Sequence, residues 1–268
     1  MLSLVALTAI GCAARRTPND RARGPYADAQ NAVDRGRMIE AGRLYDEAAR
    51  LDPDALDSWL ASARVYGRLG QWEKARARAM RALALDDDDF EAHVILGEAF
   101  LNQGDLTRAE YHFSRGKDER PDRIDGWLGL VRIAESTRSN EKAVSLLERA
   151  VEKNMKSVVL WKRLGDLRWN LKKQAPAVEA YHQASKLVPD DKNLKGKTLR
   201  LAIDARVLPV ARAVIRDMSS ADLEDVDVSM ILAMMLSKAG DVNAAQAELG
   251  RILELEPDNG NARMMSAR

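Results

Sequence analysis

Residues 161–189 read WKRLGDLRWNLKKQAPAVEAYHQASKLVP, and this stretch decides the fold. Small and apolar residues recur in it at helical spacing on both sides of a polar turn, as Ala177, Tyr181 and Ala184 illustrate. Related patterns occur at a fixed interval of 34 residues before it and after it. A period of this length is typical of stacked helix pairs, in which each pair buries its apolar face against the next pair.

Four consecutive repeats carry the period most clearly. Their marker residues are Trp59, Tyr66, Gly70, Ala75 and Ala82; Leu96, Gly97, Phe100, Gly104, Ala109, Phe113 and Pro121; Trp127, Leu130, Ala143, Leu147 and Ala150; and Trp161, Leu164, Gly165, Ala177, Tyr181, Ala184 and Pro189. The same register extends back to Gly36, Ala41, Tyr45, Ala48 and Pro53, and forward to Leu232, Gly240, Ala245, Leu249 and Pro257. Repeats therefore start near residues 22, 56, 90, 124, 158, 192 and 226.

These residues resemble the tetratricopeptide repeat family, whose pattern is W-x2-L-G-x2-Y, then A-x3-F-x2-A, then proline. The resemblance implies an all-α fold, a right-handed α-solenoid of about seven helix-turn-helix repeats over residues 25–259. Glycines such as Gly36 and Gly70 stand where the first helix of a repeat ends, a position that favours a left-handed residue. Arrays of this kind bind other proteins, and we predict no catalysis.

In this family the first helices of successive repeats line a concave groove, into which their second, fifth, ninth and twelfth positions point. The residues that the resemblance places there are Leu60, Arg64, Val94, Glu98, Leu101, Leu128, Arg132, Lys162, Asp166, Trp169, Arg200, Met230 and Met234. An apolar strip beside alternating charges suits a helix or an extended segment of a protein partner. Trp169 is either an exposed anchor for that partner or a packing residue between helices. A clamp for a terminal carboxylate is disfavoured, because only Lys162 matches such a clamp at the fifth position and no asparagine stands at the ninth.

Charge is unevenly distributed along the chain, although the net charge is only +1. Residues 153–200 hold 12 basic and 4 acidic residues, whereas residues 217–258 hold 2 basic and 10 acidic ones. Three interpretations stay open: solvated faces of neighbouring repeats, a surface for an anionic partner, or head-to-tail contact between two copies. Nucleic acid is disfavoured as a partner, since the basic residues have no interleaved aromatics and the N-terminal residues predict export.

The N-terminal residues predict that export signal. The apolar run of residues 2–10 leads into Ala9-Ile10-Gly11-Cys12, which resembles a bacterial lipobox and contains the only cysteine. The resemblance implies a signal segment over residues 1–12, lipidation of Cys12, a flexible tether over residues 13–24, and an outer-membrane lipoprotein that faces the periplasm. If the lipobox is not used, the alternative is a cytoplasmic protein.

No sequence motif indicates a metal site or a phosphate-binding site. The three histidines have no metal-ligand spacing, His93 occupies a slot that is tryptophan in other repeats, and the glycines fall at repeat turns and form no phosphate loop. We therefore predict no metal, no cofactor and no small-molecule substrate.

The sequence thus predicts a lipid-anchored interaction scaffold. The chain resembles bacterial tetratricopeptide lipoproteins that assist envelope machines, such as pilus-secretin pilots and the outer-membrane protein assembly complex, and this resemblance is one of architecture. The alternatives are a transient assembly factor for one envelope client and a regulatory subunit of a separate enzyme. Residues 260–268 form a short tail or partial cap, where self-association through the C-terminal end is a further hypothesis.

Overall fold

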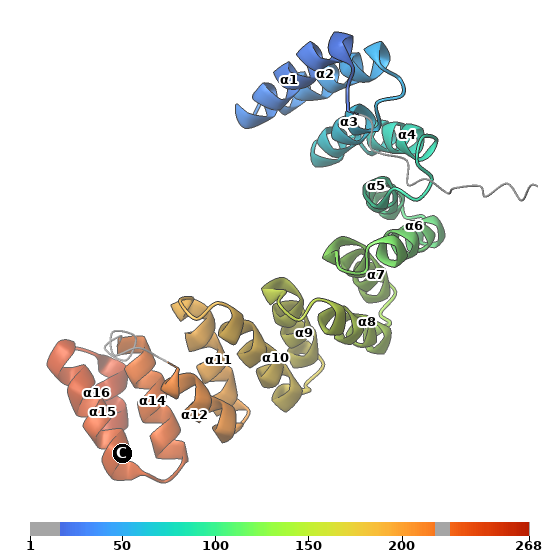
Figure 1. The fold of residues 1–268 in the computed structure, drawn as a ribbon. Coiled ribbons are helices and arrows are strands. Elements are labelled where there is room, and N and C mark those ends of the chain that lie inside the picture. Colours follow the sequence, from blue (N-terminus) through green and yellow to red (C-terminus); the bar gives the residue numbers. More distant parts are fainter. Residues whose placement is uncertain (1–16, 218–225, 268) are drawn as a thin grey trace, which may run out of the picture. The chain divides into compact units, whose positions relative to one another are not determined.

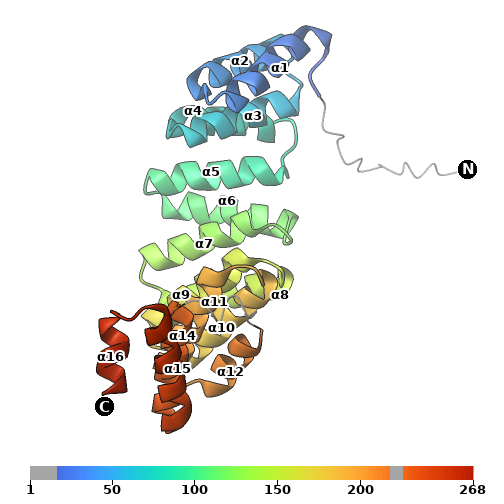
Figure 2. The same ribbon diagram turned by 90° about the vertical axis from the view of Figure 1, so that its left-hand side faces the viewer.

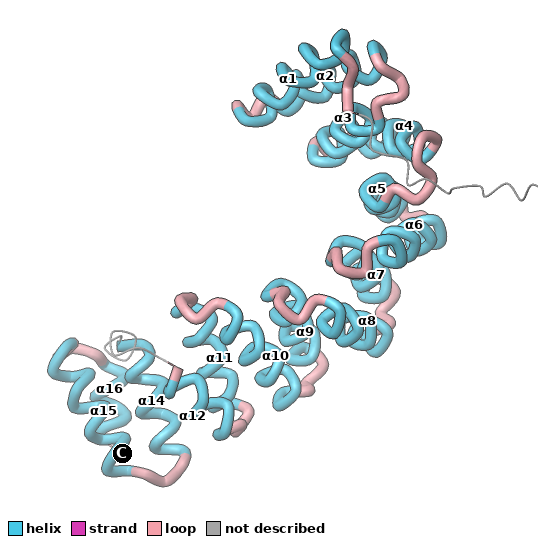
Figure 3. The backbone as a smooth tube through the Cα atoms, in the orientation of Figure 1, coloured by secondary structure: helices cyan, strands magenta, loops and turns pink. Residues whose placement is uncertain are grey.

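The computed structural model describes residues 17–217 and 226–267, and every regular element in these ranges is a helix (Figures 1 and 3). The described helices follow the predicted 34-residue register, and in six repeats the two helices pack against each other, which confirms the predicted all-α repeat architecture. The helices are α1 (Asp20–Asp34), α2 (Met38–Leu51), α3 (Leu56–Arg68), α4 (Trp72–Leu83), α5 (Phe90–Asn102), α6 (Leu106–Glu119), α7 (Ile124–Ser136), α8 (Asn140–Lys153), α9 (Val158–Asn170), α10 (Gln174–Leu187), α11 (Lys192–Asp204), α12 (Leu208–Arg216), α14 (Val226–Lys238), α15 (Val242–Leu255) and α16 (Gly260–Ser266).

The helical array begins earlier in the chain than the predicted start at residue 25. α1 begins at Asp20, inside the predicted tether, because the side chain of Asn19 caps the helix by accepting hydrogen bonds from the N–H groups of Arg21 and Ala22. At the other end, residues 260–266 form the short helix α16, whose Ala262 is buried. The predicted signal segment and Cys12 lie outside the described residues.

The chain divides into two compact units, residues Met1–Leu146 and Leu147–Arg268. In the first unit each helix from α1 to α7 packs on the next, and α5 also contacts both α3 and α7 (Figure 2). In the second unit α9, α10, α11 and α12 pack in order, α14 packs on α15, and α11 contacts α14. Contacts between first helices of successive repeats therefore occur in both units.

One position near the start of each second helix is alanine in all seven repeats, namely Ala41, Ala75, Ala109, Ala143, Ala177, Ala211 and Ala245, each 0–4% exposed. A methyl side chain lets the paired helices approach closely. Four residues further on, Phe113 is fully buried against two glycines. A Cβ atom would lie 2.7 Å from its ring at Gly97 and 2.2 Å from it at Gly129, so neither site has room for a side chain.

A partly buried carboxylate links three helices of the first unit. Asp46 on α2 accepts hydrogen bonds from Ser62 Oγ at 2.6 Å and Tyr66 Oη at 2.9 Å on α3, and from Arg78 on α4 at 2.7 and 3.0 Å. Burial alone would raise the pKa of Asp46, but these hydrogen bonds outweigh it and lower the pKa below its usual range. Burial and Asp46 together raise the pKa of Tyr66 to about 12, so both groups keep the protonation states that the hydrogen bonds need.

The first helix of every repeat is followed by a residue with positive φ, always at the same place in the period. The seven residues are Gly36, Gly70, Gly104, Arg138, Lys172, Arg206 and Gly240, with φ between 55° and 85°. Glycine adopts this conformation without a steric penalty, whereas a residue with a Cβ atom does not. The structure thus confirms the predicted left-handed position and extends it to three repeats whose sequence has no glycine there.

Replacing the three charged residues with glycine should stabilise the protein. Each of Arg138→Gly, Lys172→Gly and Arg206→Gly should add about 0.5–1 kcal/mol to the free energy of unfolding, because relief of left-handed strain exceeds the entropic cost of glycine. Urea denaturation followed by circular dichroism measures the change. The reverse substitution Gly70→Arg is the control and should destabilise, since its site has no neighbour within 4 Å and only φ opposes it. Equal stabilities for parent and variants would contradict the assignment.

Candidate functional site

The predicted binding residues belong to first helices, and we call the surface formed by positions five, nine and twelve of these helices the first-helix face. In the first unit its charges link neighbouring repeats. Arg64 on α3 pairs with Glu91 on α5 at 2.5 Å, and Arg132 on α7 pairs with Glu98 on α5. Each of these ion pairs is partly exposed, so each contributes at most about 1 kcal/mol. Their main effect is to neutralise the alternating charge that the sequence places there.

The apolar residues of this face are less accessible than predicted. Leu60 is only 2% exposed and belongs to the core of the first unit, which corrects its assignment as a binding residue. Val94, Leu101 and Leu128 are half-buried and keep part of their surface at the face.

The first-helix face of the second unit carries both a paired carboxylate and an exposed lysine. Asp166 on α9 accepts hydrogen bonds from the hydroxyl of Tyr181 and from Lys197 Nζ, the latter at 3.2 Å. Burial, followed by the contact with Asp166, raises the pKa of Tyr181 above its usual range, so the phenol stays protonated and donates. Lys162 is exposed. Trp169 is half-buried and packs against a core cluster that includes Val178, so its ring contributes to the core as well as to the face.

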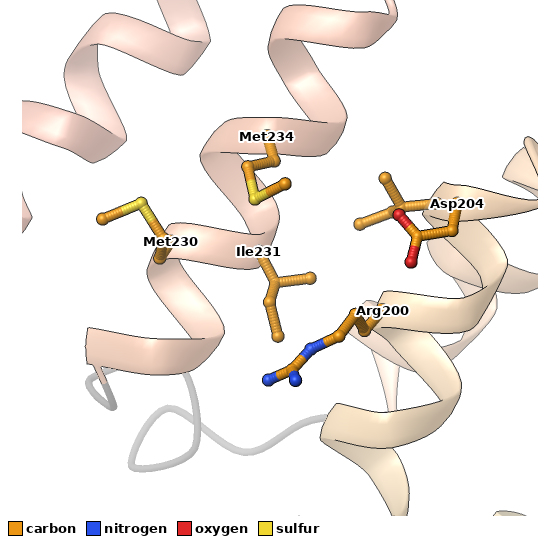
Figure 4. Close-up of a pocket in the computed structure, with 6 residues that line it drawn as sticks. Arg200, Asp204, Met230, Ile231 and Met234 are labelled. Carbon is orange, nitrogen blue, oxygen red and sulfur yellow. The ribbon is translucent and has the colours of Figure 1, made fainter. Parts of the chain in front are cut away.

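The remaining three predicted residues meet at a pocket between α11 and α14. Arg200, Met230 and Met234 line a cavity of about 220 Å³ together with Ile203, Asp204 and Ile231. Figure 4 shows Ile231 and Met234 on α14 opposite Arg200 and Asp204 on α11, while the side chain of Met230 extends away from α11. This cavity is smaller than the roughly 300–1,000 Å³ of pockets that enclose whole small molecules. It suits a side chain of a larger ligand.

Sequence reasoning missed a pair of histidines in the first unit. In three repeats the indole N–H of a tryptophan donates to the backbone carbonyl six residues earlier, as Trp127 does to Pro121 at 3.1 Å. His93 stands in this slot, and its Nε2 lies 3.0 Å from the carbonyl oxygen of Asp87, also six residues earlier. The 34-residue register therefore explains the place of His93, whereas its contact with His112 on α6 has no signal in the sequence.

The two rings are joined at 3.0 Å between their Nδ1 atoms. A carbonyl oxygen can only accept, so His93 carries its proton on Nε2 and its Nδ1 accepts from Nδ1–H of His112. His112 also stacks on Phe100, with ring centroids 5.4 Å apart. Burial, the neighbouring His93 and Arg108 lower the pKa of His112 to about 4. Burial also lowers the pKa of His93, so the pair is neutral in the folded protein near pH 7.

The histidine pair should make the stability of the protein depend on pH. Between about pH 6.5 and pH 4 the unfolded chain binds a proton at His112 that the folded chain does not, so stability falls as the pH falls through this window. His112→Phe keeps an aromatic ring beside Phe100 and removes the titrating group. The drop in Tm between pH 7 and pH 4.5, measured by circular dichroism, should be smaller in this variant than in the parent. An identical drop would refute the assignment.

The described residues contain neither a metal-binding cluster nor a helix that could span a membrane. No three of their His, Cys, Asp and Glu side chains lie close enough together to hold a metal ion. Within the same part of the chain, each helix is too short or too polar to cross a bilayer.

The geometry defines the class of this protein as a helical repeat array, and comparisons with known proteins agree. The tetratricopeptide repeat family model matches residues 60–124. The fold resembles the C-terminal part of a TPR repeat-containing protein from Cytophaga hutchinsonii, with a TM-score of 0.60 and 14% identity over 90% of this chain and 98% of that chain. A thermophilic TPR protein from Thermus thermophilus has a TM-score of 0.53 and 17% identity, over 67% of this chain and 98% of that one.

Two human proteins share part of the sequence. The protein O-mannosyl-transferase TMTC1 is 25% identical over 170 residues, which are 62% of this chain and 19% of that protein. Superkiller complex protein 3 is 28% identical over 118 residues, which are 44% of this chain and 8% of that protein. The chain thus spans less than a fifth of the length of these relatives. It contains a tetratricopeptide repeat match over residues 60–124, and proteins with these repeats generally mediate protein–protein interactions. The fold is typically non-catalytic, although TMTC1 is named as a transferase.

Proposed function

We propose that this protein is a non-catalytic scaffold that binds segments of partner proteins on its first-helix faces. The observation that carries the proposal is the placement of the ninth-position charges. Arg64 and Arg132 in the first unit, and Arg200 in the second, stay on the surface of first helices, while the small residues of the second helices are buried in the seams. A surface that is rigidly held and partly apolar, with charges at regular spacing, favours recognition of a helix or an extended segment.

Reversing charges on the first-helix face should remove partners from the protein. The double variant Arg64→Glu, Arg132→Glu replaces two cations of α3 and α7, so partner proteins that pair with this face should be captured at least tenfold less. Quantitative mass spectrometry after crosslinking and affinity purification from cell envelopes measures the loss. Arg50→Glu, Arg81→Glu is the matched control, because both arginines are exposed on second helices. Circular dichroism verifies that each variant is folded, and equal capture by both variants would argue against the proposal.

The scaffold is proposed to work at the outer membrane, held there by lipid on Cys12 and facing the periplasm. The support is the apolar run of residues 2–10 followed by the only cysteine of the chain. The Cys12→Ala variant should leave the membrane fraction and become soluble, because a protein without a lipid chain loses its hydrophobic anchor. Immunoblotting of fractionated cells measures the distribution. A variant that sediments with membranes as fully as the parent would exclude the lipid anchor.

A transient assembly factor for one envelope client is the second candidate function. The observation in its favour is the lining of the α11–α14 pocket by Met230 and Met234, because flexible methionine side chains adapt to different ligands. Loss of the multimeric state of a single client on deletion of the gene would favour this function. Co-purification at fixed stoichiometry would favour the scaffold.

A further inference from the structure

The α11–α14 pocket differs from the rest of the first-helix face in how its charges are paired. Arg64 and Arg132 occupy the ninth position of their repeats, and both have an acidic partner on α5. Arg200 occupies the same position on α11, yet it pairs with no acidic group among residues 17–217 and 226–267. Asp204, the carboxylate nearest to it in sequence, is held instead by Lys238 on α14 at 3.6 Å. Within the described ranges, the pocket therefore presents one cation without an internal counter-ion.

Beside this cation lies an apolar cavity. Ile203 is 2% exposed and Ile231 is 6% exposed, so they form the base of the pocket, while Met230 and Met234 are half-buried at its sides. The exposed Lys162 on α9 is a further cation on the first-helix face of the same unit. Apolar walls next to an unpaired guanidinium match an apolar side chain that has a carboxylate close by.

We propose that the α11–α14 pocket binds a partner segment in which an aliphatic or aromatic residue lies next to an aspartate or glutamate. The apolar side chain fills the cavity between the methionines, and the acidic side chain pairs with Arg200. The planar guanidinium can bind that carboxylate through two parallel hydrogen bonds. A side-chain carboxylate fits this site better than a chain terminus, because Arg200 is the single unpaired cation among the described residues that line the pocket. The inference rests on the proposed function and names the partner chemistry of one site.

A peptide selection tests this inference directly. Random dodecapeptides displayed on phage are selected on the full protein, and the most enriched peptide is synthesised with its acidic residue intact and with that residue changed to the amide. Selective 13C labelling of methionine methyl groups then shows where the peptide binds, with Met230→Leu and Met234→Leu used to assign the signals. We expect enriched sequences to share an apolar residue beside Asp or Glu. Their addition should shift the methyl signals of Met230 and Met234.

Variants separate the role of Arg200 from general electrostatics. Arg200→Glu should weaken peptide binding at least tenfold, and the amide peptide should bind the parent with a similar loss. Arg81→Glu is the matched control, because it reverses the charge of an exposed arginine on a second helix, away from the first-helix face, and it should leave peptide affinity within about twofold. Circular dichroism checks the folding of both variants, and Arg200 is exposed, so its replacement should not disturb the core.

Different results overturn different claims. Peptides that bind without moving the two methionine signals, or that bind Arg200→Glu as well as the parent, would refute the pocket assignment and leave the scaffold function standing. Selection that yields no binder would refute both. Shifts of the same signals on raising the protein concentration alone would assign the pocket to a second copy of the chain and overturn the proposed partner.

Discussion

The close approach of paired helices is the constraint on which the rest of the structure depends. Seven alanines, one in each repeat, are buried at the start of the second helices, and nothing larger than a methyl group stands at that position. The large side chain of Phe113 fills one of these seams, and glycine stands on both sides of its ring. Gly97 lies in the same repeat as Phe113, and Gly129 lies in the next repeat. Because interiors pack at nearly crystalline density, a larger residue at these seams would push helices apart and displace the surface residues above them.

The turns between paired helices show that the position in the repeat decides the backbone conformation, even where the residue itself disfavours positive φ. Arg138, Lys172 and Arg206 adopt the left-handed conformation that glycine adopts in the other four repeats. The packing of the two helices that they connect over-determines this turn, so it persists despite a local cost. The repeat position also decides the contacts of His93. Its Nε2 bonds the backbone carbonyl six residues earlier, as the indole N–H does where tryptophan occupies this position. Its second ring nitrogen bonds His112, a contact that an indole has no nitrogen left to make.

Charge on the first-helix faces serves two purposes. In the first unit it links neighbouring helices through Arg64 and Arg132, whose side chains stay 49% and 45% exposed at the face. In the second unit Arg200 stands beside an apolar pocket without an internal partner among the described residues. Arginines at equivalent positions of a periodic sequence thus have different roles, and the difference lies in whether a carboxylate of a neighbouring repeat is within reach.

The sequence by itself determined the all-helical repeat, its register and the identity of the seam residues, because a 34-residue period of small and large apolar residues can be satisfied only by stacked helix pairs. It also assigns the proposed binding face to the first helices. The burial of Leu60, the half-buried ring of Trp169, the pairing of Arg64 and Arg132, and the contact between His93 and His112 were decided only by the tertiary structure. These properties depend on distances between side chains of different helices, which a period along the chain does not specify. Periodicity gives each residue a place in its repeat, and packing between repeats decides what that residue touches.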